Sequence, residues 1–134
     1  MVGVVDNIAK RQLLLKRYTE AEESYRRALG LAEGLTAQAM DARTKALGIA
    51  GIYHQLGYVA QEQRQWKQAE EHYQKALQLL IEFQDQHGQG IALRSLARLW
   101  QATADPNVLT EVARILGMAQ EDAKRLLEGG VAAD

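Results

Sequence analysis

Cysteine is absent from the 134-residue sequence, and proline occurs once. The absence of cysteine excludes disulfide bonds and thiolate chemistry, and it fits a reducing compartment. The single proline, together with abundant Ala, Leu, Gln, Glu, Lys and Arg, indicates helix almost throughout. We therefore predict an all-α fold in a single domain, and we expect the protein in the cytoplasm.

Long apolar runs and a charge excess of either sign are missing as well. No stretch approaches the roughly 18 apolar residues that span a bilayer, so we expect neither a membrane segment nor a signal peptide. The formal net charge is −1, which gives the whole molecule no bulk attraction to nucleic acid or to an anionic membrane. Partners must therefore be selected by local surface.

Motifs that carry catalysis or hold cofactors are not found. The three histidines are not spaced as zinc ligands: His54, His72 and His87. Gly88-Gln89-Gly90 lacks the lysine of a phosphate-binding loop. Glu70 and Glu71 are neighbours that cannot share a helical face, so we interpret both as solvated. We expect no enzymatic activity, no metal and no cofactor.

An internal repeat organises the chain. Residues 5–31 align without a gap with residues 53–79, at an offset of 48. The best-kept positions are Ala21, Glu22, Glu23, Tyr25, Ala28, Leu29 and Leu31, which recur as Ala69, Glu70, Glu71, Tyr73, Ala76, Leu77 and Leu79. Tyr18 corresponds to Trp66, where we place the turn between two helices of each copy. Ile8 and Ala9 replace Leu56 and Gly57.

The second copy resembles a tetratricopeptide repeat, or TPR. Its small and large apolar residues have the family's spacing: Tyr53, Leu56, Gly57, Ala60, Ala69, Tyr73 and Ala76. The resemblance implies a right-handed superhelix of about three antiparallel helix pairs that binds a protein or peptide. It also implies that Tyr25, Tyr73, Trp66, Leu77, Leu96 and Trp100 serve packing rather than binding.

The expected domain covers residues 1–128, with copies at about 2–35, 37–86 and 89–117, a capping helix at 119–128 and a flexible tail at 129–134. Leu93, Leu96, Ala97 and Trp100 mark the first helix of the third copy. Asp105 as N-cap, with Pro106 next, begins its second helix, which Gly117 ends.

Two boundaries between the copies are less sharply marked. The helix after residue 34 has two N-cap candidates, Thr36, which we prefer, and Asp41. His87-Gly88 marks the break between the second and third copies.

The enlarged repeats, longer than the usual 34-residue unit, are similar to those of bacterial signalling proteins. In those proteins, such arrays follow a signal-transducing ATPase of the STAND class or a protease-like effector domain. This second resemblance implies that the chain is the C-terminal sensor or scaffold part of a larger signalling protein.

In TPR proteins the first helices of successive repeats line a concave groove. Transferred to this sequence, the groove positions are Asp6, Lys10, His54, Tyr58, Gln61, Glu62, Arg94, Arg98 and Gln101. Arg94 and Arg98 are four residues apart on one helical face, so both guanidinium groups are placed to receive a carboxylate. The predicted partner is therefore a protein or peptide, with an acidic segment favoured.

Two other functions remain open from the sequence. Val2, Val4, Val5 and Ile8 form an apolar N-terminal face, which predicts self-association into a homo-oligomer. Residues 108–128 resemble a DNA-reading helix-turn-helix, but residues 105–134 carry six acidic against three basic side chains. Phosphates would be repelled by that charge, so nucleic-acid binding is the less favoured alternative.

Overall fold

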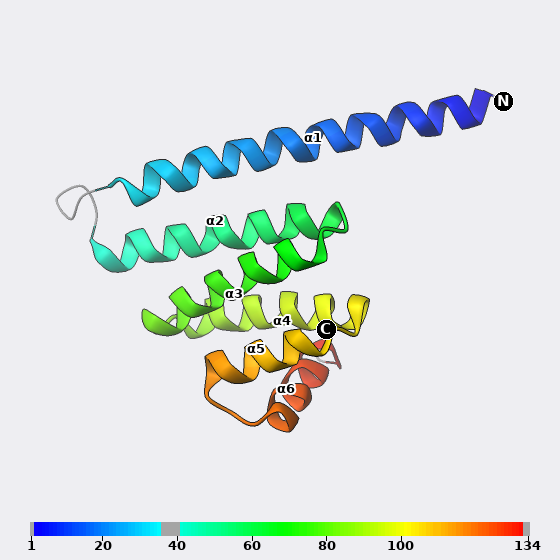
Figure 1. Ribbon diagram of the computed structural model, residues 1–134. Helices are drawn as coiled ribbons and strands as arrows, with labels where there is room; N and C mark the ends of the chain where they lie inside the picture. The colour runs from blue at the N-terminus through cyan, green and yellow to red at the C-terminus, as the bar shows by residue number, and fades with distance from the viewer. Residues whose placement is uncertain (1, 36–40, 133–134) are drawn as a thin grey trace.

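The computed structural model describes residues 2–35 and 41–132, and it describes side chains for residues 14–35 and 41–129. These residues form six helices and no strand: α1 (Val2–Glu33), α2 (Ala42–Glu62), α3 (Trp66–Glu82), α4 (Gln86–Thr103), α5 (Pro106–Leu116) and α6 (Gln120–Ala132). Each helix from α2 to α5 runs antiparallel to the one before it, so α2 and α4 point the same way (Figure 1). The predicted all-α, TPR-like superhelix is confirmed.

The helix pairs form where the sequence places small residues opposite large ones. Gly57 lies directly under the ring of Tyr73, and a Cβ added to this glycine would be 2.6 Å from two ring carbons. Ala60 and Ala69 are buried at the same contact between α2 and α3. Because no side chain intervenes there, the two helices approach closely, and the second repeat closes as a hairpin.

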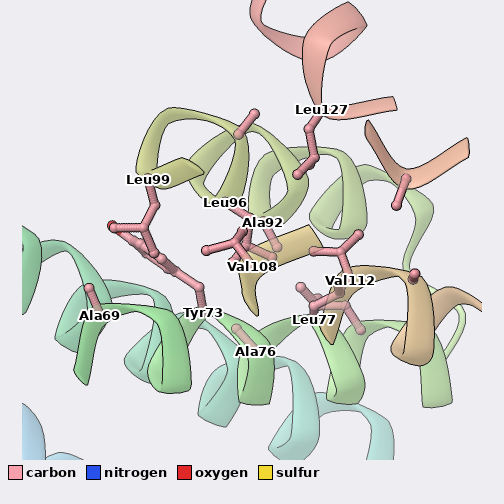
Figure 2. Close-up of a cluster of buried hydrophobic side chains, with 14 of the residues drawn as sticks. Ala69, Tyr73, Ala76, Leu77, Ala92, Leu96, Leu99, Val108, Val112 and Leu127 are labelled. Atoms are coloured by element: carbon pink, nitrogen blue, oxygen red, sulfur yellow. The ribbon is translucent and has the colours of Figure 1, made fainter. Parts of the chain in front are cut away.

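One continuous core joins α3, α4, α5 and α6. Figure 2 shows Tyr73, Leu77, Leu96, Leu99, Val108, Val112 and Leu127 converging from these helices. Val108 and Val112 come from α5, one turn apart, and Leu127 comes from α6. The six residues predicted to serve packing differ in burial. Tyr73, Leu77 and Leu96 are buried, and Tyr25 and Trp100 are half-buried. Trp66 is exposed at the first position of α3.

Local capping explains where the helices begin and end. The carboxylate of Asp41 accepts the backbone N–H of Thr44 at 2.8 Å, so Asp41 is the N-cap of α2, and our preference for Thr36 as the cap is wrong. Thr36 itself lies outside the described residues. At the C-terminal end of α1, the ammonium group of Lys45 donates to the carbonyl oxygens of Glu33 and Leu35.

The break between the second and third copies lies before the predicted position. Gln84, with φ of 56°, is in the turn between α3 and α4, and Asp85 caps α4 by accepting the N–H of Gly88 at 3.1 Å. His87 and Gly88 therefore belong to the first turn of α4. Gly88 serves close packing rather than chain reversal, because a Cβ there would lie 2.5 Å from Cδ2 of Leu80.

The first copy does not fold as the predicted hairpin, because α1 is one unbroken helix of 32 residues. At 1.5 Å per residue it is about 48 Å long, and its N-terminal end extends past the end of α2 (Figure 1). Ala9 occupies the position that corresponds to Gly57, so a hairpin with the same packing would press a Cβ into the ring of Tyr25. This added methyl group is one sequence difference that disfavours the hairpin in the first copy.

The predicted bounds of the last two helices are confirmed for α5 and are wrong at the C-terminal end of α6. Asp105 caps α5, Pro106 is its first residue, and Gly117 ends it with a left-handed φ of 67°, as predicted. The capping helix was expected to end at residue 128, but α6 continues to Ala132. Residues 129–132, predicted as part of a flexible tail, are therefore helical, and residues 133–134 lie outside the described part of the chain.

Glu70 is buried, which corrects the interpretation of this residue as solvated. Its carboxylate accepts hydrogen bonds from Asn107 at 2.7 Å and from Gln74 at 2.9 Å, so it links α3 to the start of α5. Burial raises the pKa of the Glu70 carboxyl. No local sequence pattern indicates this contact, because Asn107 lies 37 residues away, in the next repeat.

Candidate partner-binding groove

Two parallel rows of exposed residues line the face formed by α2 and α4. On α2 the row is Gly51, Gln55, Tyr58 and Glu62, and on α4 it is His87, Ile91, Arg94, Arg98 and Gln101. Successive members are three or four residues apart, so each row follows one side of its helix. We call the surface between these two rows the α2–α4 groove.

A hydrogen bond between His54 and Ser95 links the two helices across the groove. Nε2 of His54 and Oγ of Ser95 are 2.7 Å apart, and the imidazole also packs at a tilt against the ring of Tyr73, with 5.4 Å between ring centroids. His54 is half-buried, and burial lowers the pKa of its imidazole. The neutral imidazole therefore forms part of the groove floor at neutral pH.

A hollow of about 420 Å³ lies at the end of the groove where α2 and α4 begin. Leu47, Ala50, Leu80 and Ala92 contribute its apolar lining, and Ile91 forms an exposed wall. His54, Gln55, His87 and Asp85 add polar groups at the edge. A small number of polar groups around an apolar concavity is typical of a ligand-binding cleft.

The opposite end of the groove is polar. The hydroxyl of Tyr73 donates to Oε1 of Gln61 at 2.8 Å, and Tyr58, Glu62 and Arg98 are close enough to act electrostatically on that phenol. Burial is the largest cause that raises the pKa of Tyr73, so the phenol stays neutral. The hydroxyl of Tyr18 lies 3.4 Å from Oε2 of Glu62, which turns this carboxylate toward α1.

The two helices that line the groove carry a net positive charge. Together α2 and α4 contain four basic residues, Arg43, Lys45, Arg94 and Arg98, and one acidic residue, Glu62. Their net charge of +3 contrasts with −1 for the whole chain. Arg94 and Arg98 lie on the groove row of α4, whereas the ammonium group of Lys45 donates to the end of α1, so a carboxylate that approaches α4 meets two arginines although the molecule as a whole is close to neutral.

The structure places the predicted site residues in three ways. Those exposed on the two rows are Tyr58, Glu62, Arg94, Arg98 and Gln101. His54 and Gln61 are half-buried and engaged by Ser95 and Tyr73, so both form the floor of the groove. Asp6 and Lys10 lie in α1, and the structure does not describe their side chains.

Sequence reasoning missed the N-terminal half of the groove. Gly51, Gln55, His87 and Ile91 are groove residues that it did not name. Counting back by three or four residues from Tyr58 and from Arg94 would have found them.

Among the described residues, no group of three or more His, Asp or Glu side chains is placed to hold a metal ion, and no helix is both long and apolar enough to cross a membrane.

The C-terminal helices do not present a basic surface. Arg114 pairs with Glu111 at 2.7 Å, and Arg125 lies 3.8 Å from Asp122. On their inner sides, α5 and α6 bury Val108, Val112, Ala123 and Leu127 in the core. DNA binding by residues 108–128 stays an untested prediction, and the pairing of these arginines gives it no support.

Stacked antiparallel helices with small residues at the crossing points define a helical-repeat protein whose first helices share one face. Two family profiles, both described as tetratricopeptide repeat, match residues 7–35 and residues 48–107. These matches together cover more than half of the sequence, and the chain belongs to the tetratricopeptide repeat family. Neither profile is that of a catalytic family. Searches of curated proteins and of solved structures gave no match.

Proposed function

We propose that the chain is a non-enzymatic interaction module that binds an acidic peptide or partner segment in the α2–α4 groove. TPR repeats bind proteins or peptides, which supplies the general function. The observation that carries the specific proposal is the net charge of +3 on the two groove helices of a chain whose overall charge is −1. Binding by such a surface is non-covalent, and the packed helices form the groove before the partner arrives.

The resemblance to enlarged bacterial repeats supports a further part of this proposal. The module would read an input, by binding its partner, for an effector elsewhere in a cytoplasmic signalling protein. The groove is suited to this use because its floor is fixed by the His54–Ser95 and Tyr73–Gln61 hydrogen bonds.

Charge reversal at Arg94 and Arg98 tests the groove. Arg94→Glu with Arg98→Glu changes the groove helices from net +3 to net −1, so binding of an acidic partner peptide should fall by at least about tenfold. Isothermal titration calorimetry with such a peptide measures the loss. Lys124→Glu with Arg125→Glu on α6 is the matched control, because it reverses the same amount of charge away from the groove. Equal losses in both variants would place the binding surface elsewhere.

Self-association through α1 is the second candidate function, and one comparison favours it. Ala21, Tyr25, Ala28 and Leu29 of α1 are only half-buried, whereas their repeat equivalents in α3, Ala69, Tyr73, Ala76 and Leu77, are at most 1% exposed. Leu31 is 76% exposed, and Leu14 and Leu15 are 47% and 50% exposed. A second copy of the chain, laid along α1, would bury these side chains.

Analytical ultracentrifugation decides this alternative. The wild-type chain should form dimers as its concentration rises, and Leu14→Glu with Leu31→Glu should remain monomeric because charged groups resist burial in an apolar contact. The far-UV circular dichroism of the variant should be unchanged, since both leucines are exposed. A wild-type protein that stays monomeric at every concentration contradicts self-association.

A further inference from the structure

One residue on the α2 side of the hollow at the start of the α2–α4 groove, Gly51, contributes no side chain. Gly51 is exposed there, and a Cβ built on it would have no neighbouring atom within 4 Å. Across the hollow, Ile91 is 39% exposed, and Ala50 and Ala92 are each 1% exposed in the floor. The result is an apolar recess whose mouth is held open by the absence of a side chain.

From this recess, the row on α4 leads directly to two arginines. Arg94 is one turn beyond Ile91 and Arg98 is two turns beyond it, which at 1.5 Å per residue places their Cα atoms about 4.5 and 10.5 Å further along the helix. An arginine has five N–H donors, so a carboxylate from outside can add to the contacts that each already makes. The acidic residue that lines the hollow, Asp85, is engaged as the cap of α4.

We propose that the hollow is an anchor pocket for one apolar side chain of the partner, and that Arg94 and Arg98 receive an acidic residue of the same segment. An extended segment advances about 3.3 Å per residue, so the acidic residue would lie about one to three positions from the apolar one. This inference rests on the proposed function, and it specifies the partner as a short segment with an apolar anchor beside a carboxylate.

The charge and the shape of the groove together favour this occupant over a purely acidic one. An acidic tract would use the arginines and leave the apolar lining of Leu47, Leu80 and Ile91 in contact with water. A purely apolar segment would leave the net charge of +3 on α2 and α4 uncompensated. A segment with both features matches both parts of the groove, and the hollow volume of about 420 Å³ is within the range of roughly 300–1,000 Å³ for binding clefts.

Gly51→Leu is the variant that tests the anchor pocket. It fills the hollow from its open side, and it removes a helix-interior glycine, so the fold is not weakened. Gly30→Leu is the matched control: Gly30 is also an exposed helical glycine with no atom within 4 Å of a built Cβ, but it lies in α1, outside the hollow. Both variants should keep wild-type helicity by circular dichroism.

The experiment selects a random dodecapeptide display library on the wild-type protein alone, and the enriched peptides are then tested on the variants. We expect the enriched peptides to share an apolar residue with Asp or Glu within about three positions. A synthetic consensus peptide, followed by fluorescence anisotropy, should bind Gly51→Leu at least about tenfold more weakly than wild type and should bind Gly30→Leu equally well. Replacing its apolar residue by alanine should cause a loss of similar size.

Other outcomes separate the failure of the anchor from the failure of the groove. Peptides that lose affinity for the Arg94→Glu, Arg98→Glu variant but bind Gly51→Leu as they bind wild type overturn the anchor pocket and leave the proposed function standing. Enriched peptides without an acidic residue also overturn the inference. A selection that yields no peptide sensitive to either variant overturns both proposals.

Discussion

Replacing Tyr73 by alanine should destabilise the protein by about 3–5 kcal/mol, the range measured for removing a buried aromatic side chain. Tyr73 is 1% exposed, its ring covers Gly57, and its hydroxyl donates to Gln61. It also contacts the imidazole of His54 in the groove floor. The substitution would therefore open a cavity between α2, α3 and α4, and it would remove a large share of the roughly 5–15 kcal/mol that stabilises a typical domain.

The internal repeat supplies a control for this prediction. Tyr25 occupies the equivalent position in the first copy but is only half-buried, so Tyr25→Ala should destabilise by only about 1 kcal/mol. Guanidinium unfolding followed by circular dichroism compares the two variants. Because repeat arrays need not unfold in one step, the midpoint of the second-copy transition is the quantity to compare. Equal destabilisation would mean that Tyr25 is as fully packed in solution as Tyr73.

The second repeat was predictable because its packing is local. Leu56, Gly57, Ala60, Ala69 and Tyr73 all fall within one hairpin, and short-range spacing is what a sequence displays directly. Contacts between repeats were not predictable in the same way. The hydrogen bond between Glu70 and Asn107 and the one between His54 and Ser95 join residues 37 and 41 positions apart, and no local pattern connects these pairs.

In the groove, too, features within one helix were predictable from the sequence and features that depend on two repeats were not. The rows of α2 and α4 could be placed from the TPR register, because each helix shows one side to its neighbours and the other to solvent. The hollow could not be placed, because it depends on how far apart α2 and α4 stand, which α3 determines by packing against both. Gly51 and Ile91 become groove residues only when that separation is known.

The first copy was misread because identical positions in its second half do not specify a chain reversal. Seven positions of its second half are identical to those of the second copy, yet residues 5–31 form a single helix. At the turn, Leu15-Lys16-Arg17 and Gln63-Arg64-Gln65 are both made of good helix formers, so neither sequence demands a chain reversal. The reversal in the second copy, with Arg64 at a φ of 59°, is therefore maintained by tertiary packing rather than by the local sequence.

Gly57→Ala tests that conclusion, and we expect it to destabilise the protein by about 1–3 kcal/mol. The new Cβ would lie 2.6 Å from Cδ1 and Cε1 of Tyr73, and the buried ring has little room to retreat. Gly51→Ala, in the same helix, should instead stabilise by about 0.5–1 kcal/mol, because alanine is the better helix former and its Cβ meets nothing within 4 Å. The same substitution, six residues apart in α2, thus has opposite expected signs.

Chemical denaturation of the two variants measures this difference directly, and hydrogen exchange at α2 and α3 shows where it acts. Gly57→Ala should raise the exchange rates of amides in both helices of the hairpin, whereas Gly51→Ala should lower them in α2. A Gly57→Ala variant as stable as wild type would show that the ring of Tyr73 moves aside without penalty. In that case the methyl group of Ala9 would not account for the straight α1.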